Sequence, residues 1–167
     1  MDMARERKAN KQYLTPKGKT LAWITRTHLR LYRWTGGLLG KTVFQMSEQG
    51  SRFPVRAMKI LLLTTTGRKS GLKRTVPLPY FEYDGRIFIV GSFAGGAKHP
   101  AWYHNLRDDP KVHAQIGFAK GPAVARALEG EDREYYWAVF SGDWPRYRIY
   151  QEGTPRQIPL VEIGIRD

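Results

Sequence analysis

The stretch LLLTTTGRKSGLKRTVPLPYF, residues 61–81, decides the fold. An apolar and β-branched run from Ile60 to Thr66 lacks a helical period and therefore predicts a buried strand. Gly67 and Gly71 bracket a short turn, because glycine adopts backbone angles that strain other residues. A second strand is expected from Val76 to Tyr83. Two prolines inside it predict an edge or a bulge, because proline has no N–H to donate to a neighbouring strand.

The turn between these strands is strongly basic. No acidic residue occurs from 61 to 81, and four cations stand in or just after the turn: Arg68, Lys69, Lys73 and Arg74. Several cations beside free backbone N–H groups predict a site for a polyanion, most naturally phosphate or carboxylate. A solvated hairpin tip that happens to be basic is an equally open interpretation of the turn alone.

Composition excludes several classes of protein. The 167 residues suffice for one domain, and 41% are apolar, enough for an ordinary core. The absence of cysteine excludes disulfides, thiolate-bound zinc and a cysteine nucleophile, and the four histidines show no metal-binding spacing, so no metal site is predicted. No apolar run approaches the roughly 20 residues that span a bilayer, and the N-terminus lacks the apolar region of a signal peptide. We therefore expect a cytoplasmic protein.

The net charge of +13 is unevenly distributed and implies anionic partners. Residues 1–33 hold nine basic and two acidic residues. Residues 1–18 are expected to form a flexible basic arm, and residues 19–167 a single domain that begins with an amphipathic helix from Lys19 to Trp34. That helix is expected to cap the core. The alternative is that residues 1–34 lie on an anionic membrane surface, with tryptophans at the headgroup level.

The rest of the chain is predicted to contain short strands and helices. The first half holds a turn at Asp84-Gly85, a strand over Arg86–Ser92, a glycine-rich loop over Phe93–His99 and a helix over Pro100–Asp108. The second half holds a strand over Lys111–Phe118, a turn at Lys120-Gly121, a strand over Ala123–Leu128, a helix over Glu131–Ser141, a break at Trp144-Pro145 before an aromatic-rich stretch, and a strand over Ile158–Ile163. This order differs from the regular βαβ alternation of a doubly wound fold. It predicts an α+β protein with a small antiparallel barrel and helices packed around it.

No residue pattern supplies a catalytic nucleophile of its own. The chain contains neither a phosphate-binding P-loop nor a dinucleotide-binding glycine motif, and Ser92 has no adjacent base. A basic turn, a glycine loop before a helix and a C-terminal group of aromatic residues remain. Such a set suits a protein that binds a reactive cofactor and lets the cofactor carry the chemistry.

Three segments in this order closely resemble the deazaflavin-dependent nitroreductase family: LLLTTTGRKSGLKRTVPL (61–78), VGSFAGGAKHPAWYHNLRDDPKV (90–112) and DWPRYRIYQEGTPRQIPLVEI (143–163). The resemblance covers about residues 55–165. It implies a split β-barrel like that of the flavin-binding pyridoxamine-oxidase-like proteins. It also implies coenzyme F-420, a deazaflavin with a phosphodiester and a γ-linked glutamate tail, as the cofactor, with FMN less favoured.

The resemblance also implies roles for individual residues. Those that bind the phosphate and the glutamate tail are Arg68, Lys69 and Arg74. Those that run along the deazaflavin ring are Val76, Pro77 and Leu78. The loop that approaches the ring and its ribityl chain consists of Gly91, Ser92, Phe93, Ala94, Gly95 and Gly96. Further contacts with the tail or phosphate come from Lys98, Trp102 and Asn105. The candidate catalytic residues, at the reactive face and the acceptor pocket, are Ser92, Trp144, Tyr147 and Tyr150.

The implied reaction is hydride transfer from reduced F-420 to a hydrophobic acceptor such as a quinone or a nitro compound. Phe93 stands where many relatives carry a polar residue, so the pocket over the ring is expected to be narrower or drier. Trp144 replaces a tyrosine of the nitroimidazole-reducing members, which argues against activation of nitro drugs. Two alternatives stay open: an FMN- or haem-binding protein of the same fold, and a non-enzymatic basic module that binds anions or membranes. We expect no nucleic-acid partner, and the sequence leaves monomer and dimer undecided.

Overall fold

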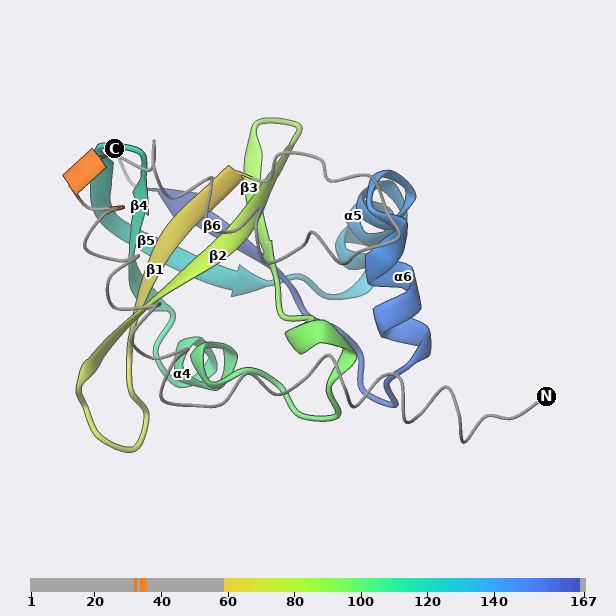
Figure 1. Cartoon of the computed structure of the whole chain (residues 1–167), viewed down its shortest axis with the longest axis horizontal. Coiled ribbons are helices and arrows are strands. Elements are labelled where there is room, and N and C mark those ends of the chain that lie inside the picture. Colours follow the sequence, from red (N-terminus) through yellow and green to blue (C-terminus); the bar gives the residue numbers. More distant parts are fainter. Residues whose placement is uncertain (1–31, 33, 36–58, 166–167) are drawn as a thin grey trace.

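Six antiparallel strands form a closed barrel in the order β1-β2-β3-β6-β5-β4 (Figure 1). The structure is a computed structural model that describes residues 32, 34–35 and 59–165. The strands are β1 Lys59–Thr66, β2 Lys73–Tyr83, β3 Arg86–Val90, β4 Lys111–Ile116, β5 Ala119–Ala127 and β6 Leu160–Ile165. The helices of residues 59–165 are η1 Phe93–Gly95, α4 Ala101–Asp108, α5 Gly130–Asp143 and α6 Pro145–Glu152. The predicted α+β barrel is confirmed.

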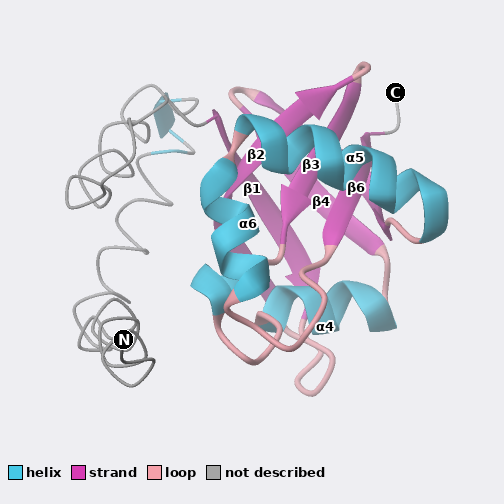
Figure 2. Cartoon of the chain, turned by 90° about the vertical axis from the view of Figure 1, so that its right-hand side faces the viewer, coloured by secondary structure: helices cyan, strands magenta, loops and turns pink. Residues whose placement is uncertain are grey.

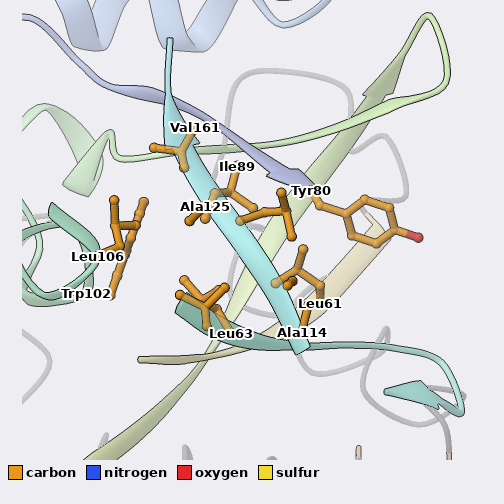
Figure 3. Packing of buried hydrophobic residues seen from close by; sticks show 12 residues of the cluster. Leu61, Leu63, Tyr80, Ile89, Trp102, Leu106, Ala114, Ala125 and Val161 are labelled. Carbon is orange, nitrogen blue, oxygen red and sulfur yellow. The ribbon is translucent and has the colours of Figure 1, made fainter. Parts of the chain in front are cut away.

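The main core fills the inside of this barrel (Figure 3). Alternate residues of a strand face the same side, so Leu61 and Leu63 of β1 point inward and meet Val161 of β6 in one buried cluster. Trp102 and Leu106 of α4 belong to the same cluster. Helix α4 is therefore fixed against one end of the barrel, immediately beside the β1–β2 hairpin.

A second apolar layer lies between the outer face of the barrel and helices α5 and α6. Phe81 of β2 packs edge-on against Phe140 of α5, with ring centroids 4.7 Å apart, and against Tyr147 of α6 at 5.8 Å. In Figure 2, α5 crosses the strands and α6 runs from its end toward the level of α4. This path brings the residues after α6 back to the glycine loop that precedes α4.

Strand β2 has an open edge, as its two prolines predicted. It pairs with β1 from Lys73 to Tyr80 but with β3 only from Tyr80 to Tyr83. Pro77 and Pro79 lie in the part that pairs with β1 alone. Residues two apart in a strand direct their N positions to the same side, so one unpaired side accommodates both prolines.

The turn predicted at Lys120-Gly121 is wrong. Ile116 pairs with Ala119, so Gly117 and Phe118 form the two-residue connection, and Gly117 supplies the positive φ of 60°. Lys120-Gly121 instead lies inside β5, which begins at Ala119 rather than at the predicted Ala123. Both positions offered a glycine, and the pairing of β4 with β5 decides between them.

Other parts of the chain also differ from the prediction. Strand β3 stops at Val90, two residues early, because the next residues turn toward Arg156. Strand β6 begins at Leu160 rather than Ile158. The aromatic-rich stretch after Trp144 is a helix, α6, in which Pro145 occupies the first turn, where its missing N–H costs nothing.

Part of the N-terminal helix lies among the described residues. Tyr32 and Trp34 are helical, as predicted, while the arm at 1–18 lies outside the described residues. The Tyr32 ring is 3% exposed, and its hydroxyl accepts a bond of 3.3 Å from the N–H of Gly117. Trp34 is 80% exposed. Among the described helices, none is long and apolar enough to cross a membrane.

Candidate functional site

A cavity of about 470 Å³ lies between the β1–β2 turn and the start of α4. Its lining residues come from these two segments and the adjoining strands: Thr65, Gly67, Arg68, Lys69, Ser70, Arg74, Val76, Ala101, Trp102, His104 and Asn105. Three of these side chains are cationic and none is acidic. The fold thus brings the predicted anion site and the predicted helix start to one place.

The three cations of the cavity have no counter-charge within residues 59–165. Arg68, Lys69 and Arg74 are exposed, and none of them forms an ion pair with any residue from 59 to 165. The first turn of α4, with no acidic residue, forms another wall. The positive end of its dipole adds to the potential of the cations. The cavity is therefore suited to a ligand with more than one negative group.

Asn105 links the two walls of the cavity. Its Oδ1 accepts a bond of 3.1 Å from the backbone N–H of Arg68, and its Nδ2 donates to Thr65 Oγ1 at 3.0 Å. The side chain is buried, with 8% exposed. Both ends of the amide are thus bonded to the hairpin. In this structure Asn105 therefore positions the basic turn.

The glycine loop lies next to this cavity. A Cβ atom on Gly91 would stand 2.6 Å from Pro159 and 3.6 Å from the ring of Trp102, which also lines the cavity. Three consecutive residues, Phe93, Ala94 and Gly95, have φ of 48°, 50° and 75°. Two of them are not glycine, and this left-handed conformation costs such residues roughly 1–2 kcal/mol each. The surrounding structure must hold the loop in this shape.

Arg156, which no sequence motif indicates, holds the loop in this shape. Its Nη2 donates to the carbonyls of Gly91 at 3.1 Å and Ser92 at 2.7 Å, and its Nε donates to the carbonyl of Gly96 at 2.9 Å. Burial lowers the pKa of the guanidinium below its ordinary value. The contact joins residues about 60 positions apart, so no local pattern in the sequence could have revealed it.

His99 completes the contacts of Arg156. Its Nδ1 lies 3.1 Å from Nη1 of Arg156, and because a guanidinium only donates, Nδ1 is the acceptor. Burial, followed by the positive charge of Arg156, lowers the pKa of His99. The neutral ring is therefore the form that suits this bond.

The predicted aromatic residues divide into two groups. Tyr150 borders the glycine loop, since a Cβ on Gly95 would lie 3.4 Å from its carbonyl oxygen and 3.6 Å from its ring. Tyr147 is 7% exposed and packs 4.7 Å from Phe140, and Trp144 packs 5.0 Å from Phe81. These two form the cluster behind the loop, and a direct catalytic role for them stays a prediction.

The remaining predicted residues lie around the same site. Val76 lines the cavity, Leu78 packs against the core, and Pro77 between them faces the other side of β2. Lys98 is exposed and does not line the cavity. Ser92 is half-buried, with its carbonyl on Arg156, and the adjacent Phe93 side chain is 57% exposed.

A sequence model of the family described as "F-420H2-dependent quinone reductase" matches residues 23–163. The chain belongs to this family. An F-420H2-dependent quinone reductase of Mycobacterium tuberculosis strain H37Rv is 33% identical over 86% of this chain and 91% of its own length. A second protein of that strain, described as a putative F-420H2-dependent quinone reductase, is 33% identical over 67% of this chain and 92% of its own.

Two solved structures also match this chain in three dimensions. An F-420H2-dependent reductase, FDR-A, is 44% identical, with a TM-score of 0.56, over 63% of this chain and 93% of its own. A protein solved as a domain-swapped dimer is 40% identical, with the same TM-score of 0.56, over 75% of this chain and 96% of its own. Both matches cover nearly the whole of the solved chain.

Proposed function

We propose that this chain is a reductase that takes a hydride from reduced coenzyme F-420 and delivers it to a quinone. The observation that carries the proposal is the acid-free cavity at Arg68, Lys69 and Arg74, in a chain of the F-420H2-dependent quinone reductase family. F-420 combines a flat ring with a phosphodiester and several carboxylates. A cavity with three cations that have no ion-pair partner among residues 59–165, beside a glycine-rich loop, fits such a molecule.

The cations are proposed to hold the anionic end of the coenzyme. Arg68 and Arg74 can each offer two parallel N–H groups to a phosphate or a carboxylate, and Lys69 offers a point charge. A charge-assisted hydrogen bond of this kind contributes roughly 1.5–3 kcal/mol where water is partly excluded. Because these side chains are exposed in the structure, the lower end of that range applies.

The ring is proposed to lie between the open edge of β2 and the glycine loop. Val76, Pro77 and Leu78 would border one side, and the backbone from Gly91 to Gly96 the other. When bound, the reduced deazaflavin supplies the hydride. The chain's own part is to orient the ring, to exclude water and to shape the acceptor pocket.

Ser92 and Tyr150 are proposed to border the acceptor, because both lie at the glycine loop. Trp144 and Tyr147 would support this wall from the cluster behind it. Phe93 offers an exposed aromatic face to a planar acceptor, which favours a quinone. Nitro compounds are proposed as poorer acceptors, because Trp144 stands in place of the tyrosine expected in nitro-reducing relatives.

An apolar quinone partitions into the bilayer, so contact of residues 1–34 with an anionic membrane would bring enzyme and acceptor together. Most of this segment lies outside the described residues. The described part supports the proposal in one respect: Tyr32 anchors to the barrel through Gly117, while Trp34, two residues on, is 80% exposed. Exposed tryptophans are favoured at the headgroup level.

The test is a pair of fluorescence titrations of the purified full chain, one with oxidised F-420 and one with FMN. We expect saturable binding of F-420 in the micromolar range, and binding of FMN at least about tenfold weaker, since FMN lacks the glutamate tail. Oxidation of F-420H2 by a soluble quinone then follows the reaction. Absence of saturable F-420 binding below about 1 mM, or tighter binding of FMN, contradicts the proposal.

A further inference from the structure

The bonds to Arg156 fix the direction of the peptide groups in the glycine loop. The carbonyls of Gly91, Ser92 and Gly96 point at the guanidinium. In a trans peptide the C=O of one residue and the N–H of the next point in opposite directions, and the described chain contains no cis peptide. The N–H groups of Ser92, Phe93 and Ala97 therefore point away from Arg156.

These three N–H groups have no acceptor in the described chain. The neighbouring groups do: the N–H of Gly91 bonds to the carbonyl of Pro159, and that of Gly95 to Ser92. Arg156 has no carboxylate partner in the part of the chain that the structure describes. Three N–H groups that point away from a cation and have no described acceptor can stabilise a negatively charged oxygen.

We infer that Arg156 is a positioning residue that turns the peptide N–H groups of Ser92, Phe93 and Ala97 toward the acceptor, where they receive its carbonyl oxygen. This inference rests on the proposed quinone reduction and assigns a subsite within it. The ligand class is a carbonyl that becomes an oxyanion. The strained φ angles at Phe93 and Ala94 agree with a loop held in one shape for binding.

The reaction balances around this oxygen. The quinone accepts two electrons and one proton as a hydride from F-420H2, and its carbonyl oxygen gains the negative charge of a hydroquinone monoanion. These N–H groups would bond more strongly to that oxyanion than to the neutral carbonyl, which favours the transition state. A proton from water or a neighbouring tyrosine then completes the hydroquinone, and the coenzyme, after loss of the hydride, releases one proton to water and so reaches its oxidised form.

The direct test follows backbone amide signals by NMR in the full chain saturated with oxidised F-420. The probe is 4-nitrophenolate, a stable planar oxyanion, and the matched control is 4-nitroanisole, which has the same ring but no oxyanion. We expect 4-nitrophenolate to move the amide protons of Ser92, Phe93 and Ala97 downfield, with little effect of 4-nitroanisole. If F-420 alone moves these three signals and 4-nitrophenolate adds nothing, the groups hold the coenzyme and the inference fails.

Kinetics of Arg156 variants give an independent readout. Removal of one oxyanion donor typically costs about 100- to 1000-fold in kcat. Because Arg156 acts through the loop, we expect about 10- to 100-fold for Arg156→Gln and a smaller loss for Arg156→Lys, with the F-420 dissociation constant within about threefold of wild type. Arg148→Lys, an exposed position on α6, is the control and should leave both values unchanged.

The outcomes separate this inference from the proposed function. If Arg156→Lys loses F-420 affinity by the same factor as it loses kcat, the acceptor role is overturned, because the loop would then bind the coenzyme. Wild-type kcat in Arg156→Gln overturns it as well. If the wild-type chain binds no F-420 at all, the proposed function itself fails. A thermal melt of each variant shows whether it is folded, and Arg156→Lys keeps the charge if Arg156→Gln does not fold.

Discussion

Two groups of arginines on this barrel carry the same charged side chain but lie in different surroundings. Arg68 and Arg74 face an acid-free cavity. Arg86 and Arg126 both bond to Glu162, with Nε of Arg86 2.8 Å from Oε1 and Nη2 of Arg126 2.8 Å from Oε2. The pKa of Glu162 is lowered, first by its hydrogen bond to Arg86. One group is neutralised by the fold, and the other has no ion-pair partner among residues 59–165 and is the proposed ligand site.

The paired group joins separate parts of the fold. Arg86 lies on β3, Arg126 on β5 and Glu162 on β6, and Asp132 of α5 contacts both arginines at 3.3–3.4 Å. Arg86 also lies 4.6 Å from the ring centroid of Tyr136, which adds a cation–π contact. The net charge of +13 therefore does not by itself locate a ligand site. The proposed site instead follows from the cations that have no carboxylate partner among residues 59–165.

The largest expected effect is a loss of F-420 affinity when cations of the cavity are removed. The double substitution of Lys69→Ala with Arg74→Ala removes two of the three cavity cations, and we expect F-420 to bind about 100-fold more weakly, because at least two charge-assisted bonds are lost. Neither side chain supports the fold through an ion pair with another described residue, so the melting temperature should stay within about 2 °C. Fluorescence titration and a thermal melt measure the two quantities. Near-normal affinity would remove the role assigned to the turn.

Asn105→Ala should lower both the free energy of unfolding and the affinity for F-420. The substitution leaves Thr65 Oγ1 and the N–H of Arg68 without their partner, and we expect a loss of about 2 kcal/mol in the free energy of unfolding. The freed turn should also weaken F-420 binding several-fold. Denaturant unfolding and titration measure these changes. Unchanged stability with a large loss of affinity would show instead that Asn105 contacts the ligand directly.

Arg86→Met should lower the stability of the fold and leave F-420 affinity unchanged, which is the reverse of the result expected for the Lys69→Ala and Arg74→Ala double variant. Loss of the bidentate bond to Glu162 should lower the free energy of unfolding by about 1–2 kcal/mol, with Arg126 still bonded to that carboxylate. F-420 affinity should stay at the wild-type value. Lys59→Met, which breaks an exposed pair with Glu82, is the control and should cost less than about 1 kcal/mol. Loss of coenzyme binding in Arg86→Met would break the division between the two groups.

The smallest expected effect is on the pH dependence of the free energy of unfolding. Because the folded pKa of Glu162 lies below its unfolded value of about 4.3, this group stabilises the fold fully above that pH and progressively less as pH falls through the folded pKa. The difference in unfolding free energy between wild type and Glu162→Gln should therefore be constant near neutrality and narrow below about pH 4. Denaturant unfolding over a pH series measures it. A difference that stays constant into acid would mean that the pair does not stabilise the fold.

The basic turn could be predicted from the sequence because it is local. A strand, a glycine-bracketed turn and a second strand are contiguous, so Arg68 and Arg74 had to lie at one hairpin end. Trp102 and Asn105 follow from the helix after Pro100, although only the structure shows that Asn105 bonds to the turn.

The rest of the site depends on contacts between distant parts of the chain. Arg156 meets Gly91 across 65 positions once the barrel closes, and no spacing rule links the two. The left-handed backbone at Phe93 and Ala94 also carries no sequence signal, because neither residue is glycine. The turn between β4 and β5 was misplaced for a related reason: Gly117 and Gly121 were both available, and strand pairing selected the first.

The most direct test of the division between the two groups is a salt series of F-420 titrations on three proteins: wild type, the Lys69→Ala and Arg74→Ala double variant, and Arg86→Met. Added salt screens exposed charges. We predict that F-420 affinity falls with salt equally in wild type and Arg86→Met, and that the double variant binds weakly with a much shallower dependence on salt. A double variant with wild-type affinity and salt dependence, or an Arg86→Met variant that loses both, would contradict the account.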